Sequence, residues 1–288
     1  MSEMQDRVCV ITGGTAGIGR ATAVALAKRG ASVVVLGRSR ERGEQARAEI
    51  ARETGNERIA FVSIDLGVQA DVRRAAAEIL ATHPKIHVLI NNAAVLLPKR
   101  ELTVDGIERM FATNYLGHFL LTNLLLDRMK ASAPARIVTV ANLIPGAKLD
   151  LDDLNFEKGK FSSFGALRPS KLALILFTRE LAKRLAGTGV TANVLEPGLA
   201  KTAQMDEQPW LTRVAIHLIS STPEKGARTS IFLASDPSVA SVTGTYFAKC
   251  REVPISGPQV DDEVLWMQLW ERSAKLCHLA SHDPGGAS

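Results

Sequence analysis

The 288-residue sequence has only three cysteines, and their placement argues against both a disulfide-rich domain and a zinc-binding domain. Cys9, Cys250 and Cys277 are odd in number and far apart, with no Cys-x-x-Cys pair and no histidine-rich stretch nearby. Disulfide frameworks and zinc sites need closely spaced ligands or an even set of partners. Unpaired cysteines are typical of a reducing compartment, so we expect a cytoplasmic protein without a metal site.

Long apolar runs are also missing. The N-terminus leads directly into a strand-like stretch, without the cationic and apolar regions of a signal peptide. The most apolar helical stretch, residues 119–126, is interrupted by Thr122 and Asn123 and is too short to span a bilayer. We therefore expect no secretion signal and no membrane partner.

Charge is not concentrated in any part of the chain. The net charge is +5, but lysine and arginine are interspersed with aspartate and glutamate. The net positive charge suits a basic pocket for an anionic ligand, whereas nucleic-acid binding would call for a basic stripe or a known motif. With 46% apolar residues, a chain of this length can bury one full core, so we expect a single domain with no nucleic-acid partner.

Short β-branched runs alternate with amphipathic helical patterns along most of the chain. We predict buried strands at residues 7–12, 32–36, 59–64, 88–90, 136–140 and 191–195. Predicted helices cover residues 18–29, 41–53, 72–80 and 102–130. This alternation predicts an α/β fold of the Rossmann type, a doubly wound parallel sheet with helices on both faces and ligands at the carboxyl ends of the strands.

Two segments interrupt the alternation. Residues 148–163 and 203–222 follow strand ends, so we expect them to form substrate walls, the second as a lid. Residues 261–276 are predicted to form a C-terminal helix that packs on the flank of the sheet, with residues 281–288 as a frayed tail.

A glycine-rich turn follows the first predicted strand and leads into a helix. Gly13 permits a sharp turn, Gly17 lets the backbone approach a pyrophosphate, and Gly19 allows the helix to pack closely on the strand. The amides and the positive dipole end of the helix face the phosphates. Strand, turn and helix in this order predict a dinucleotide site, with the other contacts from Thr15, Ala16 and Ile18.

The spacing from Thr12 to Gly19 resembles the short-chain dehydrogenase/reductase family, and the resemblance continues through most of the chain. The motifs that carry it are Asn91-Asn92-Ala93, the helix from Asn114 to Phe119, Pro197-Gly198 with Thr202, and two later stretches at residues 243–247 and 269–273. These later stretches are similar to the retinol-dehydrogenase-like branch. The resemblance implies cofactor contacts from Asn92, Ala93, Pro197, Gly198 and Thr202, and a homodimer.

The end of the second predicted strand indicates which cofactor is bound. An acidic residue there would bind a ribose 2′-hydroxyl, but this chain has Gly37 followed by Arg38 and Ser39. A guanidinium pairs well with a 2′-phosphate, so we predict NADPH. Asp65 and Leu66, after the third strand, resemble the family pair at the adenine edge.

The catalytic set of the family is incomplete here. The resemblance places Lys171 at the lysine position, Asn114 at the asparagine position and Asn142 where the family has serine. Leu167 occupies the tyrosine position, and leucine has no proton to donate. The chain has only two tyrosines, Tyr115 and Tyr246, and neither has the four-residue spacing to Lys171 that would place it on the same helix face. Packing roles are expected for Tyr115 and for His118.

Loss of the serine and the tyrosine together resembles the atypical ketoreductases of angucyclinone antibiotic tailoring. That resemblance implies an NADPH-dependent ketoreductase acting on a bulky aromatic, polyketide-like ketone. The proton would come from ordered water or from a substrate phenol. Two alternatives stay open: a catalytically silent NADP-binding regulator or scaffold, and a different reaction in the same pocket such as enone reduction.

Overall fold

The computed structural model describes residues 4–197 and 222–279, and these form one α/β domain around a central sheet. The strands are β1 (Val8–Thr12), β2 (Ser32–Gly37), β3 (Ile59–Ser63), β4 (Val88–Asn91), β5 (Ala135–Val140), β6 (Val190–Glu196), β7 (Tyr246–Ala248) and β8 (Arg251–Glu252). Their order across the sheet is β3-β2-β1-β4-β5-β6-β7-β8, and all neighbours are parallel except β7 and β8. The predicted doubly wound parallel sheet is confirmed.

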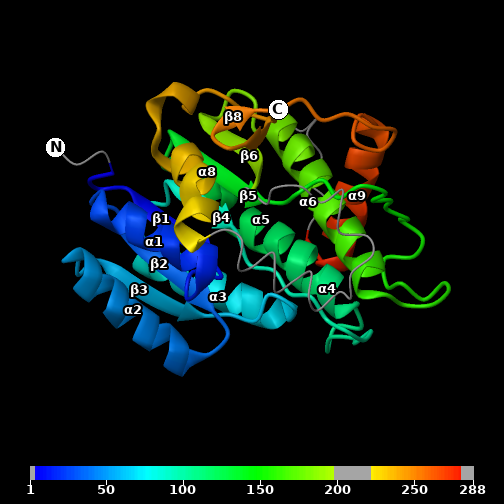
Figure 1. The fold of residues 1–288 in the computed structure, drawn as a ribbon, viewed down its shortest axis with the longest axis horizontal. Coiled ribbons are helices and arrows are strands. Elements are labelled where there is room, and N and C mark those ends of the chain that lie inside the picture. The colour runs from blue at the N-terminus through cyan, green and yellow to red at the C-terminus, as the bar shows by residue number, and fades with distance from the viewer. Residues whose placement is uncertain (1–3, 198–221, 280–288) are drawn as a thin grey trace, which may run out of the picture.

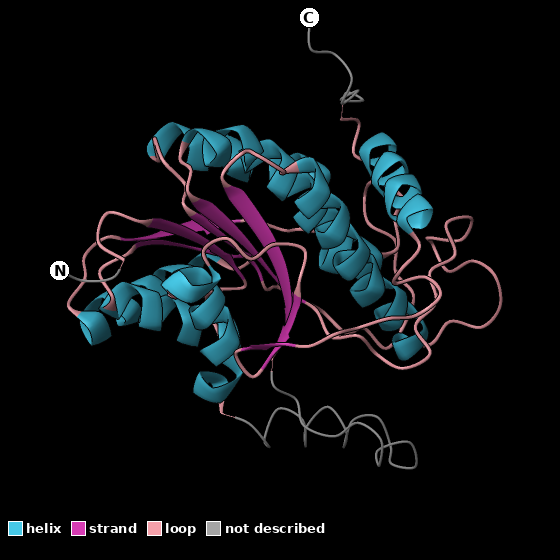
Figure 2. Ribbon diagram, turned by 90° about the horizontal axis from the view of Figure 1, so that it is seen from above, coloured by secondary structure: helices cyan, strands magenta, loops and turns pink. Residues whose placement is uncertain are grey.

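Helices cover both faces of this sheet (Figure 1). The described helical elements are α1 (Gly17–Lys28), α2 (Arg40–Thr54), α3 (Gln69–Thr82), α4 (Arg109–Phe111), η1 (Ala112–Leu116), α5 (Gly117–Ala131), α6 (Ser163–Arg184), α8 (Pro223–Ser235), η3 (Pro237–Val239) and α9 (Glu263–Leu276). One core lies between the sheet and α1, α2 and α8, and a larger core lies between the sheet and α3, α5 and α6 (Figure 2). Strands buried on both faces explain the nearly continuous apolar runs in the sequence.

The prediction of helix across residues 102–130 is wrong at its start. Leu102 pairs with Glu108 in an antiparallel bridge, and the chain turns between them at Gly106, whose φ is +72°. Helix begins only after Glu108, whose carboxylate accepts a 2.7 Å hydrogen bond from the Phe111 amide and caps it. An Asp-Gly dipeptide favours this turn over helix, because glycine adopts a positive φ without strain.

The C-terminal helix α9 packs beside α6, on the outer side of the larger core (Figure 1). Its Trp270 stacks on Phe177 of α6 at 5.7 Å between ring centroids and meets Phe119 of α5 edge to face. Arg184 of α6 lies over the same indole at 4.4 Å. The helix is therefore part of the core, as its apolar face predicts. Of the described helices, none combines the length and the apolar character needed to cross a membrane.

Candidate functional site: a nucleotide-binding edge of the sheet

The turn between β1 and α1 has the geometry that its glycines predict. Gly13 has a φ of +64°, and a β-carbon added at Gly19 would lie 2.2 Å from the Gly13 carbonyl oxygen. Only glycine therefore fits at position 19, where the helix crosses the strand end. Gly17 has a φ of +53° and faces open space, with no atom within 4 Å of an added β-carbon.

The N-terminus of α1 is suited to bind an anion. Ala16 is the N-cap residue, so no side chain satisfies the first amides, and no acidic residue lies in the first turn. Uncapped amides and the helix dipole favour a phosphate group at this position. Gly17 leaves the space that a pyrophosphate would fill, and Thr15, Ala16 and Ile18 belong to the same turn. The residues present fit a dinucleotide.

A buried hydrogen-bond network joins this turn to the end of β4. The Thr12 hydroxyl oxygen accepts from the Asn92 and Ala93 amides at 2.8 and 3.0 Å, and the Asn92 side chain donates to the Thr12 carbonyl at 2.9 Å. His118 Nε2 lies 2.9 Å from the same hydroxyl, and its Nδ1 lies 3.0 Å from the Asn114 carbonyl. Because a carbonyl only accepts, Nδ1 carries a proton. The Thr12 hydroxyl already accepts from two amides and so donates to Nε2, which leaves the ring neutral. Asn92 and Ala93 are thereby fixed beside the glycine turn.

Burial of His118 makes the stability of the protein sensitive to acid. Desolvation lowers the pKa of this ring to about 4, below the value near 6.5 of a histidine in an unfolded chain. Its contribution to folding is thus complete above about pH 6.5 and is lost as the pH falls toward 4. We expect His118→Gln to weaken the pH dependence of urea unfolding in this window, by up to about 3 kcal/mol at pH 4. The matched control is His278→Gln, which replaces an exposed histidine. If the free energy of unfolding of the wild type and of both variants varied equally with pH, the assignment of this pH dependence to His118 would be contradicted.

A cationic residue, Arg38, directly follows β2, where a phosphate group on the cofactor ribose would lie. Arg38 is exposed, and among the described residues its guanidinium has no partner. Ser39 caps α2 by accepting a hydrogen bond from the Arg42 amide at 3.3 Å. A β-carbon at Gly37 would come within 2.9 Å of the Thr15 side chain, so this residue lies against the glycine turn. Arg38 and Ser39 therefore follow the strand next to the phosphate turn.

The residues predicted for the adenine edge are partly occupied by other contacts. One oxygen of Asp65 accepts from the Gly67 amide at 2.8 Å, and the other pairs with Arg109 at 3.1 Å. Leu66 is buried in the larger core. Asp65 thus shapes the turn before α3 while its carboxylate stays partly exposed.

The three predicted catalytic residues come from three neighbouring elements. Asn114 lies in η1, where its side chain both accepts from the Val95 amide at 2.7 Å and donates to the Val95 carbonyl at 2.9 Å. It therefore holds the loop after β4. Asn142 follows β5 and is partly exposed, and its amide forms no hydrogen bond with any described residue. The Asn142 side chain is free to bind a carbonyl oxygen.

Lys171 of α6 is a buried cation without a described acidic partner. The side chain is 8% exposed, and its Nζ donates to the Val140 carbonyl at 3.2 Å. Desolvation lowers the pKa of the amine to about 8. Leu167 lies one turn earlier on the same helix and is partly exposed. No tyrosine lies on α6.

Both tyrosines of the chain are used elsewhere in the structure. Tyr115 is fully buried, and its hydroxyl lies 2.7 Å from the Ser273 hydroxyl of α9. Tyr246, at the start of β7, accepts from the Leu143 amide at 3.1 Å and lies 3.2 Å from a Glu196 carboxylate oxygen. Burial raises the pKa of each phenol. Tyr115 thus has a packing role, as the sequence suggested.

Most of the predicted site lies along one edge of the sheet. The residues follow the carboxyl ends of β1 to β6, where ligands bind in folds of this type. Pro197 directly follows β6 and is buried. Gly198, Thr202 and positions 203–221 of the proposed lid lie outside the described residues.

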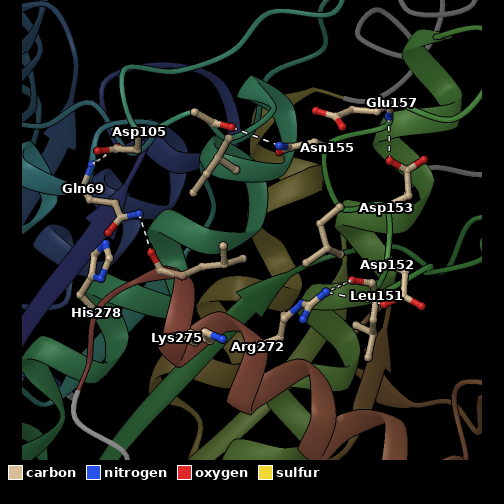
Figure 3. A pocket seen from close by; sticks show the side chains of 14 residues that line it. Gln69, Asp105, Leu151, Asp152, Asp153, Asn155, Glu157, Arg272, Lys275 and His278 are labelled. Atoms are coloured by element: carbon tan, nitrogen blue, oxygen red, sulfur yellow. Dashed lines mark hydrogen bonds and ion pairs between the residues drawn. The ribbon is translucent and has the colours of Figure 1, made fainter.

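A separate cavity of about 670 Å³ contains none of the predicted site residues (Figure 3). It is lined by residues 151–155 and 157, by the turn at Asp105, and by the end of α9. The polar side chains around it are largely paired with one another or with backbone: Gln69 with Leu276, and Arg272 with Leu151 and Asp152. Part of the segment 148–163, predicted as a substrate wall, therefore faces this cavity.

Sequence reasoning missed two residues that the structure places at this edge. Thr12 is the centre of the network behind the glycine turn, and Glu196 ends β6 one residue after Leu195, the partner of Val140 on β5. For both, the available signal was a polar residue at the end of an otherwise apolar strand.

Comparisons with known proteins agree with this geometry. Residues 7–151 match the family model for short chain dehydrogenase. Human retinol dehydrogenase 14 is 42% identical over 96% of this chain and 88% of its own length. The crystal structure of an uncharacterized protein from Mycobacterium paratuberculosis is 32% identical, covers 96% of this chain and 94% of its own, and superposes with a TM-score of 0.75. An NADP complex of RhlG from Pseudomonas aeruginosa is 25% identical over 85% of this chain and 96% of its own, with a TM-score of 0.66.

Proposed function

This chain is an oxidoreductase of the short-chain dehydrogenase family, and we propose that it is an NADPH-dependent ketoreductase for a bulky aromatic, polyketide-like ketone. The observation that carries the proposal is a glycine turn with open space at Gly17 together with a buried lysine on α6, a helix that has no tyrosine. Arg38, exposed and unpaired among the described residues, supports the choice of NADPH.

Each residue of the site would have a separate role in the reaction. The bound nicotinamide would supply the hydride. The turn from Gly13 to Gly19 would hold the pyrophosphate, and Lys171 would bind the ribose hydroxyls. The Asn142 amide would polarise the ketone by donating a hydrogen bond to its oxygen. Positioning of this kind is worth about 7–11 kcal/mol of barrier, more than a general acid contributes, so activity can survive without tyrosine.

Apolar side chains around the cleft support a bulky substrate. Leu96 and Leu97 follow β4, Leu143 and Ile144 follow β5, and Leu167 lies near the start of α6. All five are partly exposed, and Leu143 also packs against the larger core. Pockets for bulky apolar ligands are lined in this way, with a few polar groups that set the orientation.

The alternative is an NADP-binding regulator or scaffold without turnover. Leu167 favours it, because leucine cannot take part in proton transfer.

Single-turnover oxidation of NADPH separates the two functions. We expect the purified protein to oxidise bound NADPH when mixed with 1-hydroxy-2-acetonaphthone, a bicyclic aromatic ketone, and to leave acetone untouched. The reaction would be followed by the loss of the absorbance band of the reduced nicotinamide at ~340 nm. Tight NADPH binding by calorimetry without oxidation by any aromatic ketone would instead establish the binding-only function.

A further inference from the structure

We propose that Glu196 is the acid–base residue of this site, held in place by Tyr246. The inference rests on the proposed function, since it assigns the proton that a ketone reduction consumes. It concerns a carboxyl group on β6 and leaves the roles of Asn142 and Lys171 unchanged.

Sheet register places Glu196 beside the residues that would hold the carbonyl. Val140 of β5 is the partner of Leu195 of β6, and the Ala141 amide donates to the Leu195 carbonyl at 2.9 Å. Glu196 therefore neighbours Ala141, the residue directly before Asn142. Adjacent strands are about 4.8 Å apart, so the Glu196 backbone lies within about one side-chain length of the Asn142 backbone.

The side chain of Glu196 lies on the face of the sheet that α6 covers. Val194 and its partner Tyr246 belong to the core beneath α6, and so does Ala141. Because side chains alternate along a strand, Glu196 shares the face of Val194. Lys171 reaches the same part of the sheet from α6, where it donates to the Val140 carbonyl.

Tyr246 fixes one carboxylate oxygen and leaves the other available. Its hydroxyl oxygen accepts from the Leu143 amide at 3.1 Å, so its single proton is directed to Glu196 Oε2 at 3.2 Å. Glu196 Oε1 has no hydrogen-bond partner among the described residues, and the residue is partly exposed. A carboxyl group with one anchored oxygen and one accessible oxygen is suited to exchange a proton with a bound ligand.

The other titratable groups nearby fit this role less well. Among the described residues of the elements packed against this face, the carboxyl end presents Tyr246 of β7 and, on α6, Arg168 and Lys171. The Lys171 amine donates to the Val140 carbonyl and is assigned to the ribose. An arginine does not release its proton at ordinary pH. Tyr115 and His118 are fully buried and bonded to Ser273 and Thr12. Of the carboxyl groups in the part of the chain that the structure describes, Glu196 is thus the best placed beside Asn142.

The proposed step balances with NADPH as the only reductant. The hydride would pass from the nicotinamide to the carbonyl carbon, and the C=O π electrons would move onto oxygen. The Glu196 carboxyl group would pass a proton to this oxygen as the O–H bond forms, and the carboxylate left behind would take up a proton from water. In the reverse direction, the Glu196 carboxylate would accept the proton of the alcohol.

Variants at position 196 test the inference with 1-hydroxy-2-acetonaphthone as the probe ketone. Glu196→Gln keeps the hydrogen bond from Tyr246 but cannot donate an acidic proton, so single-turnover NADPH oxidation should slow by about 100-fold or more. NADPH affinity by calorimetry should stay at the wild-type value. Glu252→Gln removes an exposed carboxylate from β8 and should match the wild type. Added formate should restore part of the rate to Glu196→Ala.

Tyr246→Phe tests the positioning role. It should slow single-turnover reduction, because the Glu196 carboxyl group loses its anchor, and leave NADPH affinity at the wild-type value. The combined Tyr246→Phe and Glu196→Gln variant should be no slower than Glu196→Gln alone, whereas a purely structural tyrosine would slow both proteins by the same factor.

The methyl ether of the same ketone identifies a competing proton source. If Glu196 is the acid, methylation should change the wild-type rate little. A steep loss on methylation, with Glu196→Gln as fast as wild type on the free phenol, would assign the proton to the substrate and overturn the inference. Equal rates for wild type and Glu196→Gln on both ketones would also overturn it, while the proposed function would stand. If the wild type oxidises NADPH with neither ketone, the proposed function fails, and the inference fails with it.

Discussion

Replacing Lys171 with methionine should make the protein more stable at neutral pH and almost inactive. The amine is 8% exposed, has no described acidic partner, and has a pKa lowered to about 8 by burial. A lysine in an unfolded chain titrates near 10.4, so charging this amine in the folded protein costs about 3 kcal/mol. Methionine has a similar length and no charge. Allowing about 1 kcal/mol for the lost hydrogen bond to Val140, we expect a gain of about 2 kcal/mol.

The sign of the pH dependence gives this prediction a second test. Between about pH 8 and pH 10.4 the unfolded chain holds the lysine proton that the folded protein has released, so wild-type stability should rise with pH. The advantage of Lys171→Met should therefore shrink across this window. Urea unfolding at pH 7, 8 and 9 measures the difference directly.

The functional loss should be large because the same amine would hold the ribose. We expect NADPH binding to weaken at least tenfold and single-turnover oxidation to fall by about 100-fold. Lys183→Met, on the same helix but about half exposed, is the matched control and should stay within about 0.5 kcal/mol of the wild type. A Lys171→Met protein that is less stable than the wild type would contradict the predicted gain in stability. Normal NADPH affinity in the same protein would contradict the predicted role of the amine in binding the ribose.

Arg38→Ala should lower the affinity for NADPH by about 10- to 100-fold and leave the affinity for NADH nearly unchanged. The two cofactors differ by the 2′-phosphate, and a lost charge-assisted hydrogen bond costs about 1.5–3 kcal/mol. Gly37 and Arg38 stand at the end of β2, and Gly37 packs against Thr15 of the phosphate turn. Titration calorimetry with both cofactors is the measurement.

Arg47→Ala is the control for this change. Arg47 lies farther along α2 and pairs with Glu44 at 2.8 Å, so its removal should alter neither affinity. An equal loss of NADH and NADPH binding in Arg38→Ala would show that the residue supports the turn and does not recognise the phosphate.

Local chemistry explains why much of this edge was predictable from the sequence. Strands buried on both faces are nearly continuous β-branched runs, so the first six strands were located to within about two residues. Glycine is required at position 13 because φ is positive there, and at position 19 because a β-carbon would collide with the Gly13 carbonyl. Both constraints arise from residues that are close in sequence. Lys171 and Asn114 were located by their motifs, and the structure places them around the ends of β4 and β5.

Long-range contacts explain what the sequence did not predict. The bridge between Leu102 and Glu108 interrupts an apolar pattern that resembles a helix, and the Asp-Gly turn within it is a local signal that competed with that pattern. Glu196 and Tyr246 are 50 residues apart and meet only because β6 and β7 are neighbours in the sheet. The same holds for Thr12 and His118, which are 106 residues apart.

The hydrogen bond between Tyr115 and Ser273 has a consequence for how the protein is made. It spans 158 residues and ties the residue next to Asn114 to the last described helix. During synthesis the nucleotide turn leaves the ribosome before η1, whereas α9 emerges only after all the strands of the sheet. A nascent chain can therefore complete its phosphate-binding half while η1 still lacks this support. The support of η1 therefore waits until α9 has been synthesised, and a chain cut short before Glu263 lacks the indole of Trp270 that covers the rings of Phe119 and Phe177.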